Sequence, residues 1–288
     1  MTHLLRHSYG KHRVRVSKIQ RSVSGESKTS VHNFFEASID IELEGDFSAA
    51  YFEGDNRLVV ATDTCRNTVY VLAKDDPIDS LESFGLRIAN HFLNQYSHVD
   101  QVTVTLRQQL WQRLFDSPHG FIGNDTEIPT VCAVGVRKAT AADIKVTSGI
   151  ANCTIAKTTE SGFANFHRDE FRTLPDTDNR ILATNLTATW RYTDRLNRDF
   201  NVLRKQIREQ LLTTFLDHYS RSVQETLYRM ASAAIQRCDA IDSITLTMPN
   251  KHHIRFDLVP MGRENDNEVF VVNDEPFGFI TATVARTN

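Results

Sequence analysis

Three short segments of the sequence hold more polar side chains than packing needs, which makes them candidates for chemistry. The first is Tyr9–Val16, where Lys11 stands at the start of an expected strand. The second is Val59–Thr64, where an apolar strand is expected to stop at Thr-Asp-Thr, and the third is Met248–His252, which interrupts two expected strands. Thr, Asp and Asn also cap helices and form turns, so composition alone favours a turn at each place.

Histidine and cysteine spacing indicates no metal site. His252 and His253 are adjacent, and on a strand their imidazoles would point to opposite faces, so the pair cannot bind one ion. The cysteines are Cys65, Cys132, Cys153 and Cys238. No two of them have the CxxC spacing of a zinc or redox site, which predicts free thiols in a reducing compartment.

The common cofactor motifs are also missing from the sequence. It contains no GxGxxG, no HExxH, and no GxxxxGK followed by Ser or Thr. Gly10 and Lys11 lack the upstream glycine of a phosphate-binding loop, and His12 follows them. The sequence therefore predicts that neither a dinucleotide nor a nucleoside triphosphate serves as cofactor.

An internal repeat organises the elements that must hold these segments. Val99–Leu106 resembles Ile241–Met248 at an offset of 142 residues (241 − 99) in a chain of 288. A helical pattern precedes each copy, and the first helix is expected to carry Pro77 in its first turn. The apolar stripes are Phe84, Ile88, Phe92 and Tyr96 in the first helix, and Leu227, Met230, Ala231, Ala234 and Ile235 in the second. The repeat predicts two copies of one unit.

The strand and helix patterns indicate an α+β fold. Apolar and polar residues alternate completely from Phe35 to Glu44, which is typical of an antiparallel sheet packed on one face. A long helix is predicted from about Asp199 to Tyr219. Because strands group apart from helices, we predict antiparallel sheets with helices on one face, in repeats spanning 1–140 and 141–288. Their open sheet edges need covering, and oligomer formation is one way to cover them.

Charge and hydropathy exclude several classes of protein. The chain has 33 Lys and Arg against 36 Asp and Glu, a net charge of −3 with His neutral, which argues against a nucleic-acid binder held mainly by charge. No apolar run approaches the roughly 18 residues that a membrane helix needs, so no membrane partner is expected. The first residues have no apolar leader region, and we therefore expect a cytoplasmic protein.

Taken together, these segments resemble the urate oxidase (uricase) family over nearly the whole chain, from about Tyr9 to Arg286. Six ordered motifs carry the resemblance. They are Tyr9-Gly10-Lys11 with Val14-Arg15-Val16, Val60-Ala61-Thr62-Asp63-Thr64 with Asn67-Thr68-Val69-Tyr70, Phe163 with Arg168-Asp169-Glu170, Arg180-Ile181-Leu182-Ala183-Thr184, Ser222-Val223-Gln224, and Pro249-Asn250-Lys251-His252.

The resemblance implies a fold and an activity. The family has the tunnelling fold (T-fold), with two ββααββ-type repeats per chain and a homotetramer around a central tunnel. It oxidises urate with O2 and water to 5-hydroxyisourate and H2O2 in purine degradation, and it uses no metal and no organic cofactor. The absence of cofactor motifs agrees with that expectation.

The resemblance also assigns residues that would bind the substrate. Arg180 would grip one edge of urate through two parallel hydrogen bonds, for which its planar guanidinium is suited. Gln224 would pair with the opposite edge, helped by the backbone of Val223. Phe163 would stack on the face of the purine.

The remaining assigned residues concern the proton, O2 and a neighbouring subunit. Thr62 and the backbone at Asp63 would complete the ring of contacts from a neighbouring subunit, so the active sites would lie at subunit interfaces. Asn250 would hold O2 or water above the purine. Lys11, Thr62 and His252 would form a proton relay, in which the threonine hydroxyl both donates and accepts.

Three residues depart from the family pattern, and two other functions remain open. Asn165 stands where the family usually has Gly, Asn179 where an Asp is common, and Arg172 where a Thr is common. A pterin enzyme on the same fold would often use zinc, for which the sequence shows no ligand set. A non-catalytic purine-binding tetramer would need only the binding residues, so the presence of the whole relay argues against it.

Overall fold

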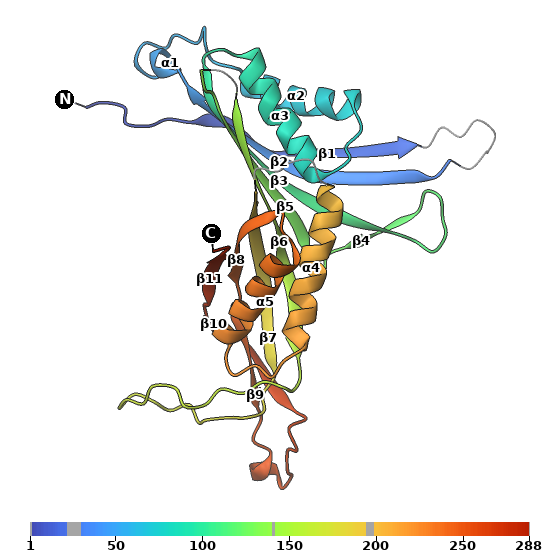
Figure 1. Ribbon diagram of the computed structural model, residues 1–288, viewed down its shortest axis with the longest axis vertical. Coiled ribbons are helices and arrows are strands. Elements are labelled where there is room, and N and C mark those ends of the chain that lie inside the picture. The colour runs from blue at the N-terminus through green and yellow to red at the C-terminus, as the bar shows by residue number, and fades with distance from the viewer. Residues whose placement is uncertain (1, 22–29, 140–141, 194–198, 288) are drawn as a thin grey trace. The chain divides into compact units, whose positions relative to one another are not determined.

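The computed structural model describes residues 2–21, 30–139, 142–193 and 199–287. The chain divides into two compact units, Met1–Gly149 and Ile150–Asn288, and each is described by itself (Figure 1). Strand β6 (Asp143–Lys157) runs across the division. The repeat boundary predicted between residues 140 and 141 falls outside the described residues and stays a prediction. No helix in the described part is long and apolar enough to cross a membrane.

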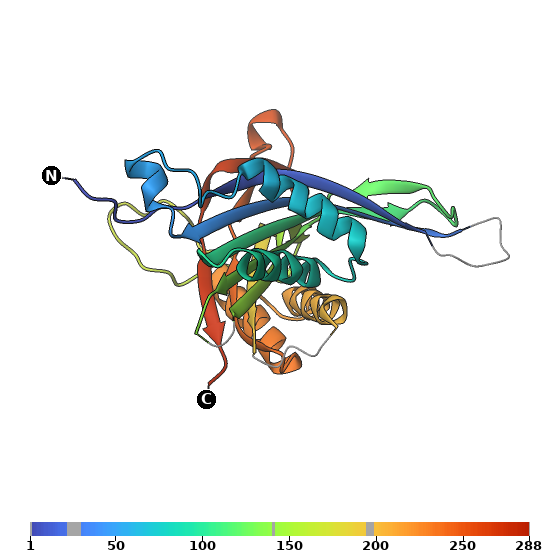
Figure 2. The same cartoon turned by 90° about the horizontal axis from the view of Figure 1, so that it is seen from above.

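The first unit is an antiparallel sheet with helices on one face. Its strands, in spatial order, are β1 (Tyr9–Arg21), β2 (His32–Gly45), β3 (Val99–Arg113) and β5 (Ile128–Val136), and β4 (Phe121–Asn124) pairs with β3. The short helix α1 (Ser48–Phe52) follows β2. Helices α2 (Thr62–Asp75) and α3 (Leu81–Gln95) pack on β1, β3 and β5, and both lie over the same face in Figure 2. The alternation predicted in β2 is confirmed, because Ile39, Ile41 and Leu43 are fully buried beneath these helices.

The second unit has the same plan. Its sheet runs β6, β7 (Leu182–Tyr192), β8 (Ile241–Thr247) and β11 (Thr281–Ala285). Helices α4 (Phe200–Leu216) and α5 (Val223–Arg237) pack on each other, and α5 packs on β8 and β11. Strand β9 (Asn250–Arg255) pairs with β7 and with β10 (Phe270–Gly278), and a 3-10 turn, Val259–Met261, lies between β9 and β10. Trp190, Leu211 and Met230 are fully buried in this core.

Two arginines support the predicted duplication by closing equivalent helix ends. Arg137 donates to the carbonyl oxygens of Leu93, Tyr96 and Val99, after α3. Arg286 donates to the carbonyl oxygens of Ile235, Cys238 and Ile241, after α5. Each acceptor of the second set lies 142 residues after its counterpart (235 − 93, 238 − 96 and 241 − 99), the offset found in the sequence. A guanidinium satisfies the unpaired carbonyls of a helix end in both units.

The structure corrects two predicted boundaries in the first unit. The first repeat helix begins at Leu81 rather than near Pro77, because Ser80 and Ser83 form reciprocal hydrogen bonds at its start, a capping box. The strand predicted before Thr62 is not formed, and Thr62 instead begins α2. In the second unit the predicted long helix is confirmed as α4, with the Asp199 carboxylate as its N-cap.

Candidate functional site

Lys11 lies on β1 beside a bulge that interrupts the pairing with β2. The register shifts between Lys11 and Val14, and Arg13 adopts a left-handed conformation with φ of 56°. The Arg13 backbone N–H donates to Oδ1 of Asp40 at 2.7 Å, which holds the bulge. Bulges of this kind redirect neighbouring side chains, so the strand sets the direction of the half-exposed Lys11 amine.

Gly10 allows β1 to pass close to β2 just before Lys11. A Cβ at this position would stand 1.8 Å from the carbonyl oxygen of Ile41. No side chain other than hydrogen fits there without moving the backbone. The close approach of the two strands therefore explains the glycine before Lys11 without a phosphate-binding role.

Thr62 and Asp63 form the first turn of α2, and Tyr9 ties the preceding residues to β1. The Val60 backbone N–H donates to the Tyr9 hydroxyl oxygen at 2.7 Å, and burial raises the pKa of Tyr9 to about 12. The helix is preceded by Ala61, which has no side-chain oxygen to act as a cap. The first-turn N–H groups of α2 therefore remain available to an acceptor on a ligand.

Helix α2 packs on β1, the strand that carries Lys11. Burial raises the pKa of Cys65 to about 11, and the Lys11 ammonium acts in the opposite direction. Cys65 lies in the first turn of α2, three residues after Thr62. The first unit thus packs the strand of Lys11 against the helix that carries Thr62 and Asp63.

Phe163 and Arg180 come from the long segment between β6 and β7. Phe163 exchanges backbone hydrogen bonds with Thr177, at 2.7 and 3.0 Å, and the Arg180 N–H donates to the carbonyl oxygen of Ser161 at 2.8 Å. These bonds bring the Arg180 guanidinium carbon to 5.4 Å from the centroid of the Phe163 ring. The structure therefore joins the two predicted binding residues as a planar cation beside an aromatic ring.

The Arg180 guanidinium is largely desolvated. Burial lowers its pKa from the ordinary value, and its Nε is buried without a hydrogen-bond partner among the described residues. A buried N–H of a charged group costs free energy unless an acceptor satisfies it. An anion with adjacent acceptors would satisfy the guanidinium here.

The structure adds Phe166 and Arg172 to this site. The Phe166 ring stacks on Phe163 with centroids 4.7 Å apart and 9° between the planes, and the guanidinium carbon of Arg172 lies 4.8 Å from the centroid of Phe166. Phe166 therefore covers one face of Phe163. Asn165 has φ of 58°, a left-handed conformation that glycine adopts freely and asparagine tolerates, which explains how Asn replaces Gly there.

Val223 and Gln224 begin α5. The Ser222 hydroxyl is the N-cap and accepts from the Glu225 N–H at 3.1 Å, whereas the N–H groups of Val223 and Gln224 point out of the first turn. The Val223 side chain is buried and that of Gln224 is exposed. This arrangement presents a backbone N–H and an exposed amide side chain at the same helix end.

Asn250 and His252 project from the same face of β9. Asn250 is nearly buried, and its Nδ2 lies 3.4 Å from Nδ1 of His252. Lys251 and His253 point to the other face, as predicted for adjacent strand residues. Among the described residues no three His, Cys, Asp or Glu side chains gather as metal ligands would.

Tyr219 was missed by sequence reasoning because the pattern placed it on the long helix. That helix ends at Leu216, and the Tyr219 hydroxyl donates to the carbonyl oxygen of Asp178 at 2.6 Å. A Cβ on Gly162 would lie 2.2 Å from the same hydroxyl. A glycine directly before Phe163 was the one sequence signal of this close approach.

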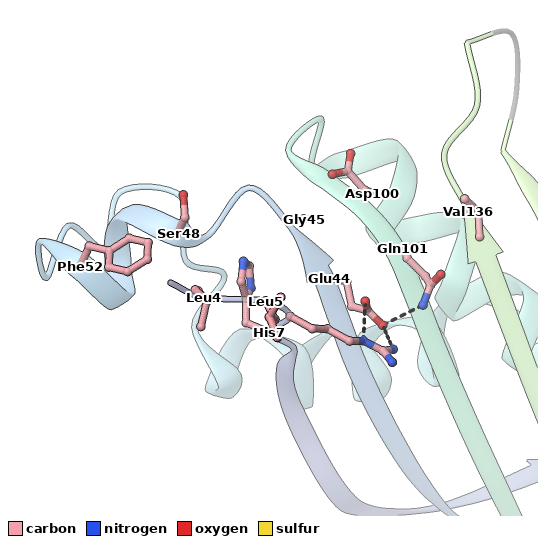
Figure 3. Close-up of a pocket in the computed structure, with 11 residues that line it drawn as sticks. Leu4, Leu5, His7, Glu44, Gly45, Ser48, Phe52, Asp100, Gln101 and Val136 are labelled. Atoms are coloured by element: carbon pink, nitrogen blue, oxygen red, sulfur yellow. Dashed lines mark hydrogen bonds and ion pairs between the residues drawn. The ribbon is translucent and has the colours of Figure 1, made fainter. Parts of the chain in front are cut away.

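A surface pocket of about 430 Å³ in the first unit contains none of the predicted residues (Figure 3). Its main charges already satisfy one another, because Glu44 accepts from Arg6 at 2.7 Å and from Gln101 at 2.8 Å. Leu4, Leu5 and Phe52 line the rest of it. We therefore do not assign the site to this pocket.

The predicted residues thus fall into three local groups. Lys11, Thr62 and Asp63 lie in the first unit. Phe163, Arg180, Val223 and Gln224 form one group in the second unit, and Asn250 with His252 form another. The relay of Lys11, Thr62 and His252 draws on both units and stays a prediction.

Comparisons with a family model and with known proteins all point to one family. The family model described as Uricase matches residues 7–134 and 146–281. A uricase of Arthrobacter globiformis is 38% identical over 278 residues, which cover 96% of this chain and 88% of that protein. A uricase of Dictyostelium discoideum is 37% identical over 294 residues, which cover 100% and 99%.

Solved structures agree with the sequence comparison. The crystal structure of uricase from Arthrobacter globiformis matches with a TM-score of 0.92 at 36% identity, over 99% of this chain and 96% of that chain. This likeness, with the two matched stretches of the family model, confirms the predicted α+β fold built from two T-fold repeats.

Proposed function

Because this chain belongs to the uricase family, we propose that it is a urate oxidase. It oxidises urate with O2 and water to 5-hydroxyisourate and H2O2, as a step of purine degradation. Urate loses two electrons and O2 gains them with two protons, while water supplies the new hydroxyl oxygen. The observation that carries the proposal is the desolvated Arg180 guanidinium beside Phe163, with an unsatisfied Nε that suits a planar anion.

The proposed binding residues contact the substrate at two edges and on one face. Arg180 donates two parallel hydrogen bonds to adjacent acceptors of the urate anion, and Gln224 with the Val223 N–H pairs with the opposite edge. Phe163 stacks on the purine through the ring face opposite to Phe166. Thr62 and the Asp63 N–H, at the uncapped start of α2, complete the contacts from a neighbouring subunit.

The chemical step needs a second proton to leave the urate anion, because the dianion is electron-rich enough to reduce O2. Lys11, Thr62 and His252 form the relay that takes this proton, and the threonine hydroxyl passes it on because it can donate and accept at once. Asn250 holds O2 or water, and its contact with His252 sets its direction. We propose that no metal or organic cofactor takes part.

A urate-dependent O2-uptake measurement tests this function. Purified protein treated with a chelator and dialysed should consume O2, release H2O2 and remove the urate absorbance in equal amounts. The same protein without urate is the control. If the urate concentration did not fall under these conditions, the proposal would be refuted. Binding of urate without O2 uptake would favour a non-catalytic purine-binding tetramer instead.

We further propose a homotetramer with active sites at subunit interfaces, acting in the cytoplasm. Exposed apolar side chains along the β9–β10 hairpin, which projects at the bottom of Figure 1, support an association surface: Ile254, Val259, Val271, Val272 and Phe277. The edge strands β1 and β11 also need cover. The four cysteines are free thiols, which fits a reducing compartment.

Size measurement by light scattering should give about 131 kDa, four times the 32.8 kDa of one chain. Replacing two exposed apolar residues of the hairpin, Val271→Lys with Val259→Lys, should shift the mass toward smaller species and reduce turnover per chain, because each site would lose its neighbouring Thr62. An exposed residue away from the hairpin, Val202→Lys on α4, serves as the matched control. An active monomer would contradict the interface sites.

A further inference from the structure

A buried hydrogen-bonded chain lies directly behind the residues that bind the substrate. His218 and Ser220 belong to the turn between α4 and α5, and Thr226 lies in the first turns of α5. Ser220 and Thr226 are fully buried. None of the three has a role in the proposed chemistry, so their arrangement asks for a separate explanation.

Ser220 is the point where the two binding segments meet. Its N–H donates to the carbonyl oxygen of Glu160 and its carbonyl oxygen accepts from the Gly162 N–H, both at 2.8 Å. Phe163 follows Gly162 in the sequence. Ser161, which lies between Glu160 and Gly162, accepts from the Arg180 N–H through its carbonyl oxygen. On the other side Ser220 leads within four residues to Gln224. The place of Ser220 therefore sets the spacing between the ring, the guanidinium and the amide.

The side chain of Ser220 is held by a chain of three further groups. Its Oγ lies 2.6 Å from Oγ1 of Thr226, which lies 3.0 Å from Nε2 of His218. Nδ1 of His218 lies 2.8 Å from the carbonyl oxygen of Thr214 at the end of α4. The Lys157 ammonium donates to the His218 carbonyl oxygen at 2.6 Å, which anchors the turn to β6.

The hydroxyl groups of these residues donate toward the start of α5. The Thr226 hydroxyl donates to Oγ of Ser220, and the Ser220 hydroxyl donates to the carbonyl oxygen of Ser222, the N-cap residue of α5, 3.1 Å away. A carbonyl only accepts, so Nδ1 of His218 carries the proton that faces Thr214. The hydrogen bonds therefore tie Ser220 to the helix end that carries Gln224.

We propose that His218, Thr226 and Ser220 are positioning residues that set Phe163, Arg180 and Gln224 for the substrate. The inference rests on the proposed function, since it takes urate as the ligand of those residues. These three hydrogen-bonded side chains affect substrate binding and touch no reacting atom. Their loss therefore changes KM more than kcat.

Thr226→Val and Thr226→Ser separate this role from a structural one. Valine keeps the shape and the β-branching of threonine but breaks both hydrogen bonds, so KM for urate should rise about 3- to 10-fold with kcat little changed, the size of one buried hydrogen bond. Serine keeps the hydroxyl and should restore a KM close to that of the wild type. A folded Thr226→Val tetramer with the wild-type KM would overturn the proposal, as would equal KM changes in both variants.

If the wild-type protein does not oxidise urate, the proposed function fails, and the same variants are then compared by their urate Kd.

Discussion

Lys11→Met should lower kcat for urate oxidation by about 10²- to 10⁴-fold, the usual contribution of a positioned proton acceptor. Methionine has a similar length and no proton-accepting nitrogen, and the bulge that directs position 11 is held by the Arg13 backbone and Asp40. Affinity for a non-reacting purine inhibitor should change little, because the proposed binding contacts come from other residues. Steady-state kinetics with inhibitor titration measure both quantities.

A matched control for this variant lies on the same unit. Lys74 is exposed in the last turn of α2, so Lys74→Met removes one lysine without touching the proposed relay. Its kcat and KM should stay near those of the wild type. Wild-type turnover in Lys11→Met would remove Lys11 from the relay, whereas a parallel loss of inhibitor binding would assign it to substrate binding.

Arg180→Lys should raise KM for urate and lower kcat/KM by about 10- to 150-fold, equivalent to roughly 1.5–3 kcal/mol for hydrogen bonds to a charged group. Lysine keeps the positive charge but presents a point charge in place of a planar fork. The comparison therefore separates two-pronged recognition of the urate edge from attraction to its charge. Equilibrium binding of urate under nitrogen gives the Kd without turnover.

Arg168 supplies the control for the second variant. It lies on the same segment between β6 and β7, is mostly exposed and reaches the Asp176 carboxylate at 3.2 Å. Arg168→Lys should leave the Kd for urate almost unchanged because the paired charge is retained. If Arg180→Lys bound urate as tightly as the wild type, the assignment of the desolvated guanidinium to the substrate edge would be wrong.

The periodic elements of the fold could be predicted because their burial repeats at short range. The strand around Ile39 and Ile41 and the long helix that starts near Asp199 follow from residue spacing alone. The start of α2 could not be predicted in the same way. An apolar run before Thr62 is typical of a strand, but no strand in the described part of the chain pairs with it, and the Val60 N–H donates to the distant Tyr9 hydroxyl.

The candidate site divides along the same line. Family motifs identified Phe163, Arg180 and Gln224, and the structure groups them through local backbone bonds. The stacking of Phe166 on Phe163 was not predictable, because it depends on the left-handed backbone at Asn165. His218 drew no attention in the sequence, since an isolated histidine has no periodic or motif signal.

The sequence by itself determined the duplication, the class of fold and the chemical types of the proposed binding residues. These properties depend on residue spacing within single elements and on ordered motifs, both of which can be read along the chain. Only the tertiary structure decided which polar groups are desolvated, as at the Nε of Arg180, and which meet across the chain, as Ser220 meets Gly162 and Thr226. Desolvation and hydrogen-bond direction arise when segments distant in sequence exclude water from one another, and no pattern along the chain records that.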